Sequence, residues 1–88
     1  MKDVVYSNAF HRDLRRMVKR GKDLSKLYAI VELLAKEFPL STKHSPHPLR
    51  GSWKPKWDCH IEPDWVLIYE VTADTVQIAR TGSHSDLF

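Results

Sequence analysis

The first half of the chain contains two stretches in which apolar residues recur every three or four positions, the spacing that places side chains on one face of a helix. In the first stretch this face comprises Phe10, Leu14, Met17 and Val18. In the second it is wider and comprises Leu24, Leu27, Tyr28, Val31, Leu34, Ala35 and Phe38. We therefore predict a first helix from near Ala9 to Gly21. The second should begin at a cap formed by Asp23 or Ser25 and end at Pro39.

Two apolar residues, Ile30 and Leu33, lie outside the centre of the second stripe. They can pack against the first helix at the rim of the core, or they can form part of a binding surface for a partner chain. The sequence leaves both interpretations open.

Strand patterns occupy most of the rest of the chain. Residues 3–6 form a short run of strand-forming residues, closed by the helix-cap pair Ser7-Asn8. Residues 57–62 alternate, which puts His60 on the face that points away from the core. A turn at Pro63-Asp64 then leads into residues 65–71, which are apolar on both faces and therefore predict a central strand. A second turn leads into another strand, at residues 76–81.

These elements predict an α+β fold, with two N-terminal helices packed on a largely antiparallel sheet of about four to five strands. Residues 39–48 contain three prolines and no periodicity, so we expect a loop there. A chain of 88 residues has room for one core, and we expect a single domain over residues 1–88.

Composition is that of an ordinary soluble globular protein, with 42% hydrophobic and 28% charged residues. No run approaches the roughly 18 apolar residues of a membrane span, and the N-terminus lacks the pattern of a signal peptide. We therefore expect a cytoplasmic protein without a membrane partner. The single cysteine, Cys59, excludes an internal disulfide and a cysteine-rich zinc site, and we expect it to be reduced and buried.

Positive charge is concentrated at the start of the chain. Residues 1–26 hold eight basic and three acidic residues, a net charge of +5, whereas residues 27–88 hold six and eight, a net charge of −2. Four basic residues of the first helix lie opposite its apolar face: Arg12, Arg15, Arg16 and Lys19. Such a stripe is a solvated helix face or a contact surface for a polyanion such as RNA.

Most of the residues that can move protons or hold phosphate lie in the last part of the chain. Antiparallel pairing across the second turn would place Arg80 near Trp65 and Asp64. His60 and His84 open onto the same end of the sheet, so four candidates converge there. His47 lies in the segment that leads into the first of these strands, and its distance from the others does not follow from the sequence.

Each candidate also has a purely structural interpretation. Asp64 is by default a turn former, and Arg80 would pair with Asp64 or Glu62. Histidines in loops are commonly surface residues. The three tryptophans are more often core than base-stacking platforms, although an exposed one, with Trp65 as the candidate, would stack on RNA. Phe88 would fray at the chain end unless something docks it.

Taken together, three histidines, an aspartate and an arginine suit acid–base cleavage of RNA. One group removes the 2′-hydroxyl proton, another protonates the leaving 5′-oxygen, and a cation stabilises the charge of the phosphorane. Such chemistry requires no metal and no cofactor. Imidazole and carboxylate also bind zinc, but no ligand motif such as HExxH is present.

Four stretches of the second half follow one another as in a known family. The chain resembles the YafQ-like branch of the RelE/ParE superfamily of bacterial type II toxins through HPLRGSW (residues 47–53), DCHIEPDW (58–65), VLIYEV (66–71) and RTGSHSDLF (80–88). The opening helices match more loosely, in Tyr6-Ser7 and in the pattern KRxKDxxKL of residues 19–27.

The resemblance implies a RelE-like fold and a ribosome-dependent endoribonuclease, or mRNA interferase, that enters the A site of the 70S ribosome and cuts the mRNA codon there. It also implies a cognate antitoxin that holds the toxin inactive in a heterotetramer. By position, Arg80 would bind phosphate, Phe88 would position the mRNA base, and the acid–base and transition-state group would be His47, His60, Asp64 and His84. We expect His84 and Asp64 to be the proton-transfer pair, and the basic face of the first helix to contact ribosomal RNA.

Two other functions remain open on the same scaffold. ParE-like toxins poison DNA gyrase by binding it, and they are expected to lack a histidine-rich site. A noncatalytic RNA- or protein-binding module would carry the histidines as surface residues only.

Overall fold

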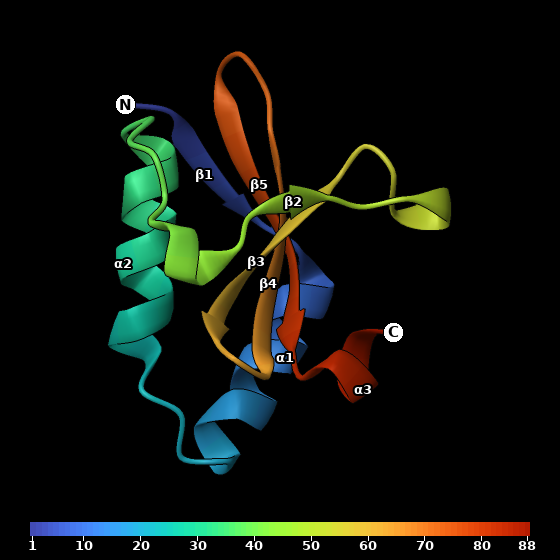
Figure 1. Cartoon of the computed structure of the whole chain (residues 1–88). Helices are drawn as coiled ribbons and strands as arrows, with labels where there is room; N and C mark the ends of the chain where they lie inside the picture. Colours follow the sequence, from blue (N-terminus) through green and yellow to red (C-terminus); the bar gives the residue numbers. More distant parts are fainter.

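Five strands form a single sheet in the order β1-β5-β4-β3-β2 (Figure 1). The structure, a computed structural model, describes all residues from 1 to 88. The strands are β1 (Asp3–Tyr6), β2 (His47–Pro48), β3 (Trp57–Glu62), β4 (Trp65–Val71) and β5 (Thr75–Gly82). Neighbouring strands pair antiparallel, except that β1 runs parallel to β5. The predicted α+β fold with a largely antiparallel sheet is confirmed.

The two long helices, α1 (Asn8–Lys19) and α2 (Leu24–Ala35), begin at predicted caps. The Ser7 hydroxyl accepts a hydrogen bond from the backbone N–H of Phe10, and the Asp23 carboxylate accepts one from Ser25. Gly21 has a φ of +77°, a conformation that favours glycine, and it reverses the chain after α1.

Three short helices were not predicted: η1 (Thr42–His44), η2 (Gly51–Trp53) and α3 (His84–Leu87). The predicted loop at residues 39–48 contains η1 and the two-residue strand β2. Elements of two to four residues are too short to show a periodic pattern, which is why sequence analysis missed them.

We call the side of the sheet covered by α1 and α2 the helical face. It forms the main hydrophobic core, in which the strands contribute Cys59, Ile61, Trp65, Leu67, Tyr69, Val76 and Ile78. The helices contribute Phe10, Met17, Leu27, Ile30, Val31 and Leu34. Burial of each large apolar side chain stabilises the fold by about 1.5–3 kcal/mol. Burial also raises the pKa of the Cys59 thiol to about 12, so the expected buried cysteine is confirmed.

Some residues of the predicted helix stripes lie outside this core. Val18 is 55% exposed, and Tyr28 and Phe38 are 42% and 57% exposed, so the apolar stripes of the two helices are only partly buried. Ile30, by contrast, is only 2% exposed. On α2 the buried face includes Ile30 and leaves out Tyr28, so it is shifted from the stripe that the sequence indicates. Ile30 packs in the main core, and Leu33 is partly exposed.

The opposite side, which we call the open face, is only partly covered. Val66, Ile68 and Leu87 are buried there, with Leu49 and Trp53 packed against them, so α3 and the segment around η2 provide the cover. Since β4 is buried on both faces, its prediction as a central strand is confirmed. Figure 1 shows the loop that carries η2 projecting away from α2. None of the helices has the length and hydropathy needed to cross a bilayer.

Candidate active site

The chain end presents His84 to the carboxylate of Asp64. Ser83 caps α3 and forms a reciprocal capping box with Asp86, which fixes His84 at the first helical position. Asp64 lies in the turn between β3 and β4. The backbone N–H of His84 donates to Asp64 Oδ1 at 2.9 Å, and His84 Nδ1 lies 2.6 Å from the same oxygen. The predicted proximity of Asp64 and His84 is confirmed.

These contacts determine the protonation of the pair. Hydrogen bonds from the backbone and ring of His84 hold the pKa of Asp64 below its ordinary value, so Asp64 is ionised at neutral pH. A carboxylate only accepts hydrogen bonds, and His84 Nδ1 must therefore carry the hydrogen. The other ring nitrogen, Nε2, has no hydrogen-bond partner within the chain.

Two further aromatic rings lie next to His84. The His60 ring, on β3, meets it edge-on with centroids 5.3 Å apart, and the Phe88 ring lies 6.4 Å from it. Phe88 packs edge-on against Trp53 at 5.8 Å, and its N–H donates to the carbonyl of His84. The chain end is thus docked, which removes the reason to expect fraying.

His47 approaches the same cluster through Asp58, a residue that sequence analysis did not select. In the pairing of β2 with β3, His47 lies opposite Asp58. The two side chains are 3.0 Å apart between Nδ1 and Oδ1, although the hydrogen-bond geometry of Nδ1 favours the carbonyl of Ser45. Asp58 is buried and its Oδ1 has no hydrogen-bond partner. Its place on the same strand face as His60 was the signal that could have identified it.

The electrostatics of Asp58 link the histidines to one another. Burial raises the pKa of this carboxyl, and the charges of His47, His60 and His84 oppose the rise. His47 lies against this buried acid, and His60 lies two positions further along the same face of β3.

Arg80 lies elsewhere than predicted. Its Nε and Nη2 atoms donate to the carboxylate of Asp13, on α1, at 2.6 and 3.1 Å. The same carboxylate accepts from the backbone N–H of Thr81, along the edge of β5 where β1 has ended. The predicted pairing of Arg80 with Asp64 or Glu62 was wrong, as was its expected position near Trp65.

The reason is the strand register. A bulge between β4 and β5 puts Arg80 opposite Ile68, further along the sheet from Asp64 than a regular hairpin would. Asp13 holds the guanidinium along its Nε–Nη2 edge and raises the pKa of Arg80. The Nη1 end stays free of hydrogen bonds within the chain, and it is able to bind phosphate.

Trp65 cannot stack on RNA as predicted. Its side chain is fully buried in the core, and its Nε1–H donates to Thr81 Oγ1 at 2.9 Å. Thr81 in turn donates to the carbonyl of Val66. The ring therefore has a structural role, because every polar atom of this inner group is satisfied within the protein.

The basic stripe of α1 is exposed as predicted, but it is not uniform. Arg12, Arg15 and Lys19 make no ion pair within the chain, whereas Arg16 lies 3.6 Å from Asp13 and 3.9 Å from Asp86. The stripe also belongs to the helix that packs on the helical face, while His60 points to the open face. Arg16 is the member of the stripe that reaches α3, through Asp86, whereas Arg12, Arg15 and Lys19 make no ion pair with the elements of the histidine cluster.

No group of three or more histidine, cysteine, aspartate or glutamate side chains is arranged to hold a metal ion. The open face therefore brings together His60, Asp64, His84 and Phe88, with His47 joined to them through Asp58. It does not bring Arg80 into contact with these side chains by any hydrogen bond or ion pair.

Comparisons with known proteins agree on the whole length of the chain. Residues 2–88 match the family model described as the bacterial toxin of type II toxin-antitoxin system, YafQ. The chain is 42% identical over 88 residues to the mRNA interferase toxin YafQ of Escherichia coli strain K12, covering 99% of this chain and 96% of the relative.

Two solved structures illustrate the similarity of the fold. The crystal structure of the Escherichia coli DinJ–YafQ complex matches with a TM-score of 0.92 and 42% identity, covering 100% of this chain and 99% of that one. A metal-bound toxin from Helicobacter pylori matches with a TM-score of 0.93 and 42% identity, covering 100% of both chains. The chain belongs to the YafQ family of bacterial toxins of type II toxin–antitoxin systems.

Proposed function

We propose that this protein cuts the mRNA codon in the ribosomal A site by metal-independent acid–base catalysis. Membership of the YafQ family makes it a type II toxin and an endoribonuclease, the class that the name mRNA interferase denotes in its Escherichia coli relative. The observation that carries the finer proposal is the His84–Asp64 pair, with its 2.6 Å contact, beside the His60 ring. An imidazole oriented by a carboxylate is suited to proton transfer at a phosphodiester.

The proposed reaction is attack of a ribose 2′-oxygen on the adjacent phosphorus. The P–O5′ bond breaks, and the products are a 2′,3′-cyclic phosphate and a free 5′-hydroxyl. One side chain removes the 2′-hydroxyl proton and a second delivers a proton to the 5′-oxygen. His84, through Nε2, serves as one of these groups, with Asp64 stabilising its protonated form, and His60 is positioned to serve as the other.

Three further residues have supporting roles in this proposal. Arg80 offers its free Nη1 end to the phosphate and stabilises the charge that develops on it. His47 stabilises the same charge from the β2 side of the cluster. Phe88, docked on Trp53 with its ring half exposed, provides a flat surface on which an mRNA base stacks.

The partners follow from the same proposal. The unpaired residues Arg12, Arg15 and Lys19 of α1 contact ribosomal RNA on the far side of the sheet from the cluster, where phosphate neutralisation supplies affinity. A cognate antitoxin binds the toxin, as DinJ binds YafQ in the Escherichia coli complex, and we propose a heterotetramer of two toxins and two antitoxins.

Cleavage of a defined mRNA on purified 70S ribosomes tests this function. We expect fragments that end in 2′,3′-cyclic phosphate, and none from the same mRNA without ribosomes. A chelator selective for transition metals, which leaves the magnesium of the ribosome in place, should not change the rate. Loss of cleavage with this chelator, restored by one added metal, would overturn the metal-independent mechanism.

Expression in cells separates this function from gyrase poisoning. We expect translation to stop before any DNA damage response begins. DNA breakage with intact mRNA would favour the gyrase alternative. Growth arrest that survives the simultaneous loss of His60, Asp64 and His84 would favour a noncatalytic module.

A further inference from the structure

The segment between Glu37 and Asp58 carries positive charge that the proposed reaction has not used. It contains no acidic residue and four basic ones: Lys43, Arg50, Lys54 and Lys56. This net charge of +4 over 20 residues is slightly higher per residue than the net charge of +5 over the first 26 residues. The segment therefore has the charge of a polyanion-binding surface.

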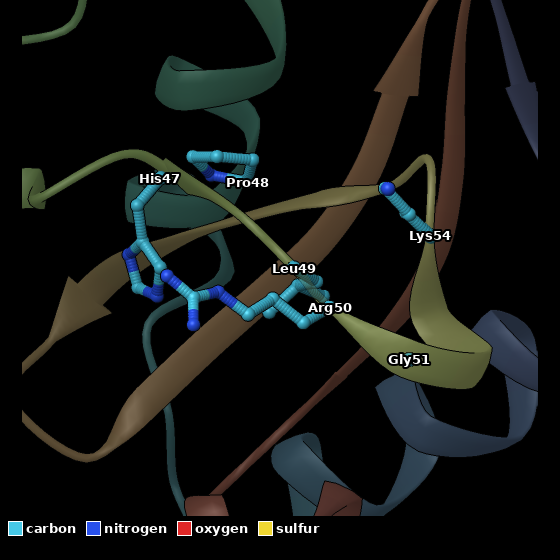
Figure 2. A pocket seen from close by; sticks show the side chains of 6 residues that line it. All are labelled: His47, Pro48, Leu49, Arg50, Gly51 and Lys54. Atoms are coloured by element: carbon cyan, nitrogen blue, oxygen red, sulfur yellow. The ribbon is translucent and has the colours of Figure 1, made fainter.

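Two of these cations line a hollow next to the histidine cluster. The hollow has a volume of about 600 Å³ and is lined by His47, Pro48, Leu49, Arg50, Gly51 and Lys54. Figure 2 shows the Arg50 side chain pointing back toward the His47 ring, with Lys54 on the returning arm of the loop. Gly51, with a φ of +64°, permits the tight reversal that puts the two cations on opposite arms.

The loop is held in place by the site itself. Leu49 and Trp53 pack into the small cluster on the open face, and Trp53 contacts Phe88. The backbone N–H of Leu49 donates to the carbonyl of Lys56 across the loop. Arg50 and Lys54 thus alternate with anchored residues, so their positions relative to His47 and Phe88 are defined before any ligand binds.

No side chain of the protein neutralises these two cations. Arg50 and Lys54 are exposed and take part in none of the side-chain hydrogen bonds or ion pairs. Some other basic residues are paired, since Lys22 and Lys26 bind Glu62 and Arg20 binds Asp86, whereas the stripe of α1 also holds unpaired cations. What distinguishes the hollow is that its two uncompensated cations lie beside His47, and this concentration of positive charge favours an anionic ligand.

We propose that Arg50 and Lys54 form a phosphate-binding subsite for the substrate RNA strand, beside the scissile phosphate and on the His47 side of it. This inference rests on the proposed function. The Arg50 guanidinium binds two non-bridging oxygens of one phosphate, and the Lys54 ammonium binds as a point charge. Because the contacts are to phosphate, the subsite aligns the strand without reading its sequence.

With this subsite, the two faces of the sheet would bind different RNAs. The strand to be cut runs over the open face, from Phe88 past the histidines to the hollow. The stripe of α1, on the other side, is left to hold structured RNA. Removing charge from the hollow should therefore weaken cleavage without changing which codon is preferred.

A double-mutant cycle between protein and RNA tests the subsite. Single phosphates on either side of the cut are replaced in turn by an uncharged methylphosphonate, and cleavage on ribosomes is measured for the wild type and for Arg50→Gln with Lys54→Gln. One methylphosphonate should slow the wild type by about 10-fold to 100-fold, the value of a charge-assisted contact. The double variant should show a similar loss on normal RNA, and no further loss with that methylphosphonate.

The control is Lys26→Gln with Lys36→Gln, which removes two charges from α2. It should stay sensitive to the same methylphosphonate. Equal sensitivity of the hollow variant and the wild type at every phosphate would overturn the subsite while leaving cleavage, and hence the proposed function, intact. Absence of cleavage by the wild type on unmodified mRNA would instead overturn the proposed function.

Discussion

The helical face and the open face of the sheet are built from alternate residues of the same strands, yet they differ in almost every property. Cys59, Leu67 and Tyr69 point to the helical face, where helices exclude water. His60 and Asp58 point to the open face, where short elements leave titratable side chains within reach of solvent or of one another. The helical face provides most of the stability. The open face has only partial cover, which leaves room for chemistry.

Because of this difference, residues that support stability and residues that support activity can be substituted independently of one another. Successive residues of a strand point to opposite faces of the sheet, so two adjacent residues can have unrelated roles. Substitutions on the helical face should change stability with activity following only through folding. Those on the open face should change activity at constant stability.

The largest effect is expected for His84→Ala. Loss of a group that transfers a proton lowers the rate by about 10²-fold to 10⁴-fold, and we expect single-turnover cleavage on ribosomes to fall by that factor. The melting temperature should barely change, because the side chain is half exposed. His11→Ala, at an exposed histidine of α1, is the matched control. Undiminished cleavage by the His84 variant would show that the catalyst lies elsewhere.

Leu67→Ala should have the opposite profile. Leu67 is fully buried on the helical face, and truncation of such a side chain costs about 2–5 kcal/mol of folding free energy. We expect a lower urea midpoint, but cleavage per folded molecule should remain close to that of the wild type at low temperature. A large loss of activity in the folded variant would break the separation of the two faces.

Asp13→Asn tests the connection between α1 and Arg80, the residue that we propose binds phosphate. The carboxylate accepts hydrogen bonds from Arg80 and from the backbone of Thr81, and loss of its charge should cost about 1–3 kcal/mol of stability. Cleavage should fall as well, because Arg80 loses the partner that orients it.

Glu62→Gln is the control, since Glu62 also binds two cations but is far more exposed. It should leave both stability and cleavage nearly unchanged. If Asp13→Asn lowers stability yet leaves the ratio of kcat to KM and its salt dependence unaltered, Arg80 is a structural residue only.

The smallest effect is expected for Asp86→Asn, which tests how the stability added by α3 depends on acidic pH. Hydrogen bonds from Arg20 and Ser83 hold the pKa of Asp86 well below its ordinary value of 3.8. A carboxyl whose pKa is lowered in the folded state adds stability above that ordinary value, and this contribution is lost as the pH falls below it. Melting temperatures between about pH 5 and about pH 2 should therefore fall less steeply for Asp86→Asn than for the wild type. Parallel curves would exclude Asp86 as a source of acid sensitivity.

Sequence patterns predicted the fold wherever a residue's role depends on its near neighbours. The alternation of β3, the apolar run of β4 and the caps at Ser7 and Asp23 are local signals, and each is confirmed. The hairpin turns also predicted the meeting of Asp64 with His84. Family resemblance, and not spacing, added His47 and Phe88 to the candidate group, and their roles stay predictions.

What could not be predicted depends on contacts between distant segments. Asp13 binds Arg80 across 67 positions of the chain, because α1 crosses the edge of β5. Asp58 is buried only because β2 and the histidines cover it, and β2 is too short to leave a pattern. Trp65 was selected for its aromatic ring, but burial is decided by the packing of both helices. The hollow that the basic loop around Arg50 forms beside His47 depends on the fold and leaves no local pattern.

Mapping of mRNA ends in cells that express this protein tests the central claim most directly. Both the positions of the cuts and the chemistry of the ends should be determined, for the wild type and for His84→Ala. If the open face is an RNA-cleaving site that acts in the ribosomal A site, cuts will fall in one reading frame, upstream ends will carry 2′,3′-cyclic phosphate, and both signals will vanish in the variant. Cuts without a reading frame, or in-frame cuts that persist in the variant, would contradict this account.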